Sequence, residues 1–204
     1  ADPHGGPGHE RPPPAEIEKL HCPSLATLLQ RLTFPRPPAL IAEMVYHFGR
    51  VASGPAGEAE TMQALYAHAA RDLRLSECDA PDPGPGEVRL RLARGGICGS
   101  DLHYHQHGGF GTVRLREPMI LGHAVAGFVD ALGDGVEGFA VGDLVAVSPS
   151  RPCRACRECL RGLPNQCLNM RFYGSAMPFP HIQGAFRESL VADAAQCVTA
   201  DGLS

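Results

Sequence analysis

The chain has 204 residues, 44% of them hydrophobic and 20% charged, with a formal net charge of −4 and a pI near 6.2. These values exclude the clustered basic excess with which proteins usually attract nucleic acid or anionic membranes. No apolar run approaches the roughly 18 residues of a membrane span, and the first residues form neither a basic nor an apolar leader. We therefore expect a cytoplasmic protein whose partners are neither nucleic acid nor membrane.

Residues 1–61 have the composition of a poorly ordered extension. They open with ADPHGGPGHERPPP and contain PRPP at residues 35–38, and proline at this density prevents long helices and paired strands. One short amphipathic helix is compatible with the leucine spacing in residues 24–32. We expect Met62 to open the folded part, residues 62–204, with the preceding residues added in front of it.

From residue 62 the pattern changes to alternating and β-branched runs separated by glycine-containing turns. The runs are QALYAHA, EVRLRLA, AVAGFVDAL, GDLVAVS and ESLVAD, and each has the length and composition of a strand. A short helix is expected at residues 100–107, capped by Ser100 or Asp101. With 24 glycines, 19 prolines and no tryptophan, the chain is predicted to be mainly β.

Four of the eight cysteines crowd into one segment with the spacing C-x2-C-x2-C-x7-C; they are Cys153, Cys156, Cys159 and Cys167. Thiolates at this spacing can hold Zn²⁺ in a tetrahedron and leave it no open position, so such a zinc is structural. Disulfides, ordinary buried thiols and an iron–sulfur cluster are the alternatives. The neighbouring arginines are expected to offset thiolate charge or to face solvent: Arg151, Arg154, Arg157 and Arg161. Three further cysteines have no partner pattern and are interpreted as structural or incidental: Cys22, Cys78 and Cys197.

The segments GGICGSDLH and LGHAVAGFVDALGDGVEGFAVGDLV, at residues 95–103 and 121–145, resemble the zinc-containing medium-chain dehydrogenases. The family signature G-H-E-x2-G-x5-G-x2-V is matched except at Ala124, which replaces its glutamate. SDLHYHQHGGFGTVRLREPMILGH and IQGAFRESLVAD look most like the L-idonate 5-dehydrogenases, relatives of the sorbitol and threonine dehydrogenases. The resemblance covers residues 62–204. It implies a GroES-like, partly closed antiparallel barrel with the cysteine lobe projecting from it.

The resemblance implies a catalytic zinc with Cys98 and His123 as two of its protein ligands, acting as a Lewis acid on an alcohol. It also implies that Ser100 hydrogen-bonds the reacting oxygen and starts proton removal, while Asp101 orients the ligand histidine. His103 matches the outer relay histidine of the family.

The next two histidines along the chain carry a weaker signal. His105 and His107 are expected to be solvated or to line the substrate pocket, with a functional role as the alternative.

Two departures from the family are expected to weaken this site. Loss of the glutamate at Ala124 removes a group that supports the metal, which typically changes affinity or activity by about 10- to 100-fold. The third zinc ligand, a glutamate in the polyol dehydrogenases, is expected beyond Ser204, as is the Rossmann domain with its G-x-G-x-x-G turn. We interpret GGFGTVRLRE as a substrate-side loop, so we expect no nucleotide-binding residues in the chain.

The implied function is NAD- or NADP-linked oxidation of a secondary hydroxyl on a small polyol or sugar acid, with one structural zinc and one catalytic zinc if that site is complete. Without the nucleotide-binding domain we expect the chain alone to be inactive. Homo-oligomers are common in the family, and the exact substrate, the choice between NAD and NADP and the oligomeric state of this chain stay open. The alternatives are a non-enzymatic zinc module derived from such an enzyme and a nucleic-acid-binding zinc knuckle, which the acidic balance opposes.

Overall fold

The computed structural model describes residues 61–200, and the predictions made for residues 1–60, including the helix at 24–32, lie outside the described part. Strands dominate the described residues, and their pairings are antiparallel. The mainly β prediction is confirmed. In chain order the elements are β1 (Thr61–Ala69), β2 (Asp72–Asp79), β3 (Glu87–Gly96), α3 (Gly99–His107), β4 (Gly109–Phe110), β5 (Val113–Arg114), β6 (Met119–Ile120), β7 (Ala124–Leu132), β8 (Leu144–Val147), β9 (Ser150–Arg151), α4 (Arg157–Leu160), η1 (Pro164–Gln166), β10 (Arg171–Phe172), β11 (Ser189–Asp193), η2 (Ala194–Gln196) and β12 (Cys197–Thr199).

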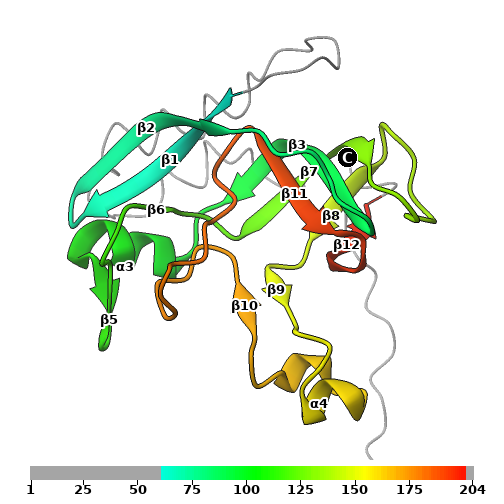
Figure 1. Cartoon of the computed structure of the whole chain (residues 1–204). Coiled ribbons are helices and arrows are strands. Elements are labelled where there is room, and N and C mark those ends of the chain that lie inside the picture. The colour runs from blue at the N-terminus through cyan, green and yellow to red at the C-terminus, as the bar shows by residue number, and fades with distance from the viewer. Residues whose placement is uncertain (1–60, 201–204) are drawn as a thin grey trace, which may run out of the picture. The chain divides into compact units, whose positions relative to one another are not determined.

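The larger sheet has five strands in the order β11-β3-β7-β8-β12 (Figure 1). Strand β3, between β11 and β7, alternates buried and half-buried side chains, because successive side chains of a strand point to opposite faces. Val88, Leu90 and Leu92 are buried, and Arg89 on the other face pairs with Asp130 on β7 at 2.9 Å. Burying each of these aliphatic side chains stabilises the fold by about 1.5–3 kcal/mol, so the inner face of β3 anchors the core.

The smaller sheet has three strands in the order β2-β1-β6. Leu65 of β1 and Met119 of β6 face a second core, which Tyr104 of α3 and Phe186 also enter. This packing fixes α3 against the smaller sheet, and α3 carries three of the residues that the family resemblance assigns to catalysis.

The two sheets are joined by backbone hydrogen bonds from a connecting segment, residues 184–188. Phe186 accepts from Leu65 N at 2.9 Å and donates to Leu121 O at 2.8 Å, while Glu188 N donates to Gln63 O at 3.1 Å. In the five-stranded sheet β11 and β12 are edge strands that do not pair with each other. No strand in residues 61–200 closes the two sheets into a barrel, because the chain between them crosses over as irregular backbone, and the partial closure of the expected barrel stays a prediction.

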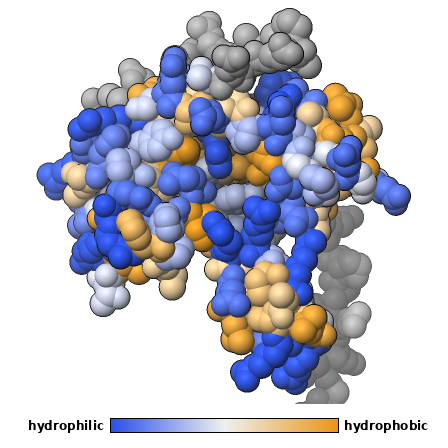
Figure 2. Space-filling model, viewed as in Figure 1, coloured by the Kyte–Doolittle hydropathy of each residue, from blue (hydrophilic) through white to orange (hydrophobic). Residues whose placement is uncertain are grey.

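The cysteine lobe projects from the sheets on a narrow neck, as expected (Figure 1). The neck is the two-stranded pair β9-β10, and α4 and η1 form the lobe beyond it. Figure 2 shows apolar residues among the charged ones on the lobe, where Leu160 is 76% exposed. No helix in residues 61–200 has the length and apolarity to cross a membrane.

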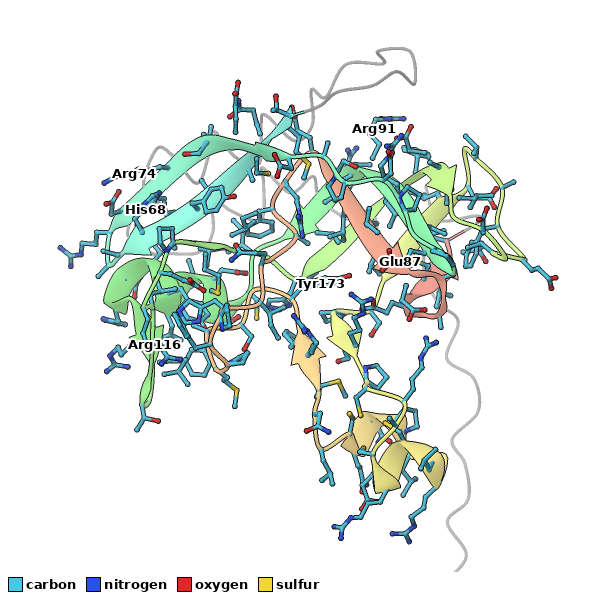
Figure 3. The ribbon with its side chains drawn as sticks, viewed as in Figure 1. His68, Arg74, Glu87, Arg91, Arg116 and Tyr173 are labelled. Atoms are coloured by element: carbon cyan, nitrogen blue, oxygen red, sulfur yellow. The ribbon has the colours of Figure 1, made fainter. Side chains whose placement is uncertain are left out.

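The arginines of the lobe are exposed, as expected, and each of them is also paired with a carboxylate. Arg151 lies 3.0 Å from Glu87 and Arg154 lies 2.8 Å from Asp193, so both connect the lobe to the larger sheet (Figure 3 labels Glu87). Arg157 and Arg161 pair with Glu158 at 2.6 and 3.5 Å within the lobe. The sequence pattern could not reveal these partners because two of them are far away along the chain.

Each predicted strand run falls on a strand, namely β1, β3, β7, β8 and β11. The predicted helix is also present, but it begins at Gly99 and its N-cap is Cys98 instead of Ser100 or Asp101. Asp101 caps from inside the first turn, where its Oδ2 accepts from Cys98 N at 2.8 Å. A carboxylate at this position satisfies a backbone N–H that the helix itself leaves without a partner.

Candidate metal and substrate site

Asp101 joins the two segments that carry the expected metal ligands. Its side chain is only 5% exposed, and its Oδ1 accepts from Gly122 N at 3.0 Å while its Oδ2 accepts from Cys98 N. Burial raises the pKa of this carboxyl, against the lowering effect of the two backbone donors and of the His123 charge. Asp101 therefore holds the backbone beside each expected ligand, and its role in orienting the His123 ring stays a prediction.

His123 follows Gly122 in the connection between β6 and β7 and leads directly into β7. Gly122 has φ +89°, a left-handed conformation that glycine adopts without strain. The turn aims the His123 ring at α3, where its Nε2 lies 3.1 Å from Ser100 Oγ. Phe172 of β10 stacks at a tilt against the ring, with 5.2 Å between centroids, so His123 is held from both sides.

A cavity of about 640 Å³ opens in front of Ser100 and His123. Its polar end is formed by these two side chains, and the remaining wall is largely apolar: Tyr104, Phe110, Leu168, Met170, Phe172, Met177, Pro178 and Ile182. This volume falls within the range of small-molecule sites, which combine apolar walls with a few placed polar groups. Phe110 belongs to the GGFGTVRLRE segment, which supports the substrate-side interpretation of that loop.

A second, more open cavity of about 410 Å³ lies on the other side of His123. Ala124, Arg94 and Pro149 line it, and the Ala124 side chain is exposed there. The guanidinium of Arg94 donates to the carbonyl of Ala93 at 2.8 Å. Since the family places a glutamate at this position, Ala124 leaves space where a carboxylate would stand.

The remaining α3 histidines differ in exposure. His103 and His107 are exposed and face each other with 5.9 Å between ring centroids, while His105 is half-buried and its Nδ1 has no hydrogen-bond partner within residues 61–200. Neither His105 nor His107 lines the 640 Å³ cavity. The expectation that His105 and His107 line the substrate pocket therefore does not hold for this cavity.

The four lobe cysteines come together as predicted, with their sulfurs all within 4.8 Å of one another. Backbone N–H groups point at the sulfurs: Cys153 N lies 3.2 Å from Cys167 Sγ, and Cys156 N lies 3.3 Å from Cys153 Sγ. Donation from Ala155 and Cys156 lowers the pKa of Cys153 to about 6. Burial instead raises the pKa of Cys159 to about 12. Four clustered sulfurs with no disulfide nevertheless form the donor set that structural zinc requires.

The cysteines without a partner pattern lie apart from this cluster. Cys197 is buried at the start of β12, and burial raises its pKa to about 11. Cys78 is half-buried near the end of β2, where burial raises its pKa. Both are protonated at neutral pH, which fits a structural interpretation. Cys22 lies outside the described residues.

Sequence reasoning missed most of the cavity wall. Met177, Pro178 and Ile182 belong to a loop without periodicity, and Tyr104 carried no motif. The apolar character of SAMPFPHI was a usable sign, because a loop so rich in large apolar residues must cover something.

Comparison with protein families and known proteins gives one consistent result. The model of the alcohol dehydrogenase GroES-like domain matches residues 84–202. L-idonate 5-dehydrogenase (NAD(P)(+)) of Escherichia coli K12 is 47% identical over 109 residues, which are 53% of this chain and 31% of that protein. Sorbitol dehydrogenase of Bacillus subtilis is 38% identical over 127 residues, 62% of this chain and 35% of that protein. The chain thus spans about a third of the length of these curated relatives.

Solved structures agree with this assignment. The crystal structure of the Escherichia coli K-12 L-idonate 5-dehydrogenase superposes with a TM-score of 0.63 at 38% identity, over 70% of this chain and 40% of that chain. A cobalt- and zinc-bound thermostable alcohol dehydrogenase from Pyrobaculum aerophilum gives a TM-score of 0.58 at 30% identity, over 71% of this chain and 42% of that chain. Because the family model covers more than half of it, the chain belongs to the zinc-dependent medium-chain alcohol dehydrogenase family through its GroES-like domain.

Proposed function

We propose that the chain is the catalytic-domain part of a zinc-dependent, NAD(P)-linked dehydrogenase that oxidises a secondary hydroxyl of a polyol or sugar acid. The supporting observation is the Ser100–His123 pair, 3.1 Å apart at the polar end of a 640 Å³ cavity. The likeness to L-idonate 5-dehydrogenase and sorbitol dehydrogenase supports the choice of substrate class.

Cys98 and His123 would hold the catalytic zinc, whose contribution is Lewis-acid activation of the alcohol. A thiolate and an imidazole are suitable zinc donors, and Asp101 ties their backbone segments together. Catalytic zinc usually has three protein ligands, so the proposal requires a third from outside the described residues.

Ser100 and His103 would carry the proton away from the substrate hydroxyl. Residues three apart lie on the same side of a helix, and Ser100 and His103 are separated by that interval on α3. Ser100 Oγ faces the cavity, while the His103 ring is exposed. Ser100 would accept the proton of the substrate hydroxyl and at the same time pass its own hydroxyl proton to His103. His103 would then release a proton to water.

The lobe would hold a structural zinc through its four sulfurs, which lie close enough together to share one ion. Four thiolates leave no open coordination position. We propose that this zinc stabilises the lobe that carries Leu168 and Met170 to the cavity wall.

A second candidate is a non-enzymatic zinc module, and Ala124 is the observation that favours it. An alanine next to the ligand histidine cannot replace the carboxylate of the family, and the adjoining 410 Å³ cavity stays open. In this alternative the lobe keeps its zinc while the Cys98–His123 site does not.

Metal content separates the two candidates without an activity assay. The protein to measure is the chain extended past residue 204 by the corresponding residues of a family member, which supply the third ligand. Mass spectrometry of this protein folded with zinc should find two ions per chain if both sites are competent, and one if only the lobe binds. In the single-zinc case, Ala124→Glu should restore the second ion, and failure of Ala124→Glu to do so favours the module.

Turnover provides the direct test. The chain should be assayed with zinc, NAD or NADP and a panel containing L-idonate, sorbitol and simple secondary alcohols. A fusion to a nucleotide-binding domain of the family should be assayed beside it, with and without Ala124→Glu. We expect oxidation only by the fusion proteins, because hydride transfer needs an acceptor positioned against the alcohol. Inactivity of both fusion proteins would contradict the proposed function.

A further inference from the structure

The loop at residues 175–182 forms one wall of the 640 Å³ cavity, to which Met177, Pro178 and Ile182 contribute. Two backbone hydrogen bonds close its base, from Ser175 N to Ile182 O at 3.1 Å and from Ile182 N to Ser175 O at 3.0 Å. Toward α3, Ala176 N donates to the Tyr104 hydroxyl at 2.9 Å. The base of the loop is thus fixed independently of its tip.

The tip has little apolar packing of its own. Met177 is 71% exposed and Phe179 is 56% exposed, whereas His181 beside them is only 5% exposed. A short segment with so little buried apolar surface depends on specific polar contacts for its position. His181 is the buried polar residue that supplies them.

His181 makes three hydrogen bonds that connect the tip to itself and to the segment before β6. Its Nδ1 lies 2.9 Å from Pro178 O, and its Nε2 accepts from Arg116 N at 2.9 Å. Its own backbone N–H donates to Glu117 Oε1 at 2.7 Å. Through these contacts one side chain places Pro178 in the cavity wall.

The chemistry of the partners determines the protonation of the ring. A carbonyl oxygen only accepts, so Nδ1 carries the hydrogen; a backbone N–H only donates, so Nε2 carries none. Protonation would put a hydrogen on Nε2 facing the Arg116 N–H, and the two donors would repel each other. The observed loop position therefore requires neutral imidazole.

The charged groups around His181 act in opposite directions. The Glu117 carboxylate at its backbone favours a positive ring. The Arg116 guanidinium disfavours one, and it lies over the Phe179 ring with 4.2 Å to the centroid, while that ring meets His181 edge-on. Figure 3 labels Arg116 beneath α3. These two charges oppose each other. The ring is therefore kept neutral by the hydrogen bond from Arg116 N to Nε2, which a hydrogen on Nε2 would prevent.

We propose that His181 is the positioning residue of the substrate cavity, and that substrate binding weakens when its ring loses the hydrogen bonds to Pro178 O and Arg116 N. The inference rests on the proposed function in so far as the cavity is the substrate site. His181 acts through Pro178 and Met177, without contacting the reacting atoms.

Nuclear magnetic resonance of the chain itself tests the positioning without turnover. With labelled histidine rings and Met and Ile methyl groups, His181 should show a hydrogen on Nδ1 at neutral pH. The methyl signals of Met177 and Ile182 should move when the two ring hydrogen bonds are removed, because the loop tip then loses the polar contacts that hold it in place. An Nε2–H form at neutral pH would contradict the proposal.

Two variants separate the ring from other causes. His181→Ala removes both ring hydrogen bonds and should move the methyl signals of Met177 and Ile182; if it fails to fold, His181→Asn, which keeps a donor toward Pro178, replaces it. The control His68→Ala, at a half-buried histidine on β1, should leave these signals in place. Methyl signals that stay in place in the folded His181 variant overturn the proposal.

Kinetics of the fusion protein with sorbitol as the probe give the functional readout. His181→Ala should raise KM about tenfold, the size expected for the loss of one or two hydrogen bonds, and should leave kcat unchanged, which loss of stability alone would not do. A KM equal to that of wild type in the folded His181→Ala variant contradicts the inference, whereas a fusion protein without turnover contradicts the proposed function.

Discussion

Ser100 Oγ and His123 Nε2 lie 3.1 Å apart, although 23 residues separate them in the chain. The contact exists because Asp101, on the same helix as Ser100, also holds Gly122 N beside His123. One helix therefore supplies both the hydroxyl and the carboxylate that fixes the facing segment. Five predictions test this arrangement and the cysteine lobe.

Replacing Ser100 with alanine should lower kcat of the fusion protein by about 10²- to 10⁴-fold, the usual contribution of a positioned proton-transfer group. Ser100→Thr keeps a hydroxyl and should recover much of the loss. Zinc content and thermal unfolding should match wild type in both variants, since Ser100 is only half-buried. A kcat for Ser100→Ala within threefold of wild type would remove Ser100 from the mechanism.

Asp101→Asn should lower the free energy of unfolding by about 1–3 kcal/mol, because one of two buried backbone N–H groups would face an amide donor. Denaturant unfolding of the chain measures the change. Asp134→Asn, on an exposed turn, is the matched control and should change stability by less than about 0.5 kcal/mol.

The effect of Asp101→Asn on the free energy of unfolding should depend on pH. Burial raises the pKa of Asp101, so the folded state favours the protonated carboxyl. Its contribution to stability is complete below the unfolded pKa and decreases as pH rises through the folded pKa. The stability difference between wild type and Asp101→Asn should therefore be largest in acid, and a difference that grows with pH would contradict this assignment.

Gly122→Ala should destabilise the fold more than Gly135→Ala. Both positions have positive φ, which costs a non-glycine residue about 1–3 kcal/mol. At Gly122 the new methyl group would also collide with the Phe186 ring, whereas it would meet nothing within 4 Å at Gly135. Crowding of a packed core adds about 1–3 kcal/mol. Equal melting temperatures of the two variants would show that the Phe186 contact is not tight.

Cys153→Ser should remove one zinc ion per chain, measured by mass spectrometry, while Cys78→Ser should remove none. The pKa of Cys153 is lowered to about 6, so its thiolate persists at neutral pH. Zinc binding requires the deprotonated sulfur, so acidification should release the ion. Retention of lobe zinc in Cys153→Ser would disprove ligation by this sulfur.

The sequence by itself determined the strands and the cysteine cluster. Alternation in EVRLRLA and glycine-containing turns are local signals, and a strand has a period of two wherever one face is buried. The spacing of Cys153, Cys156 and Cys159 is equally local, because two intervening residues keep consecutive sulfurs within reach of one ion. Such features need no knowledge of distant contacts.

Only the tertiary structure decided the joining of the sheets, the acceptors of Asp101 and the wall of the cavity. Tyr104 and Ala176 are 72 residues apart, and His181 and Arg116 are 65 residues apart, yet each pair shares a hydrogen bond. No periodicity encodes such pairs, because they form where two irregular segments meet after the sheets have packed. The sequence shows that residue 181 is a histidine and residue 101 an aspartate. Only the fold shows which backbone N–H groups donate to these two side chains, and these donors determine what each side chain does.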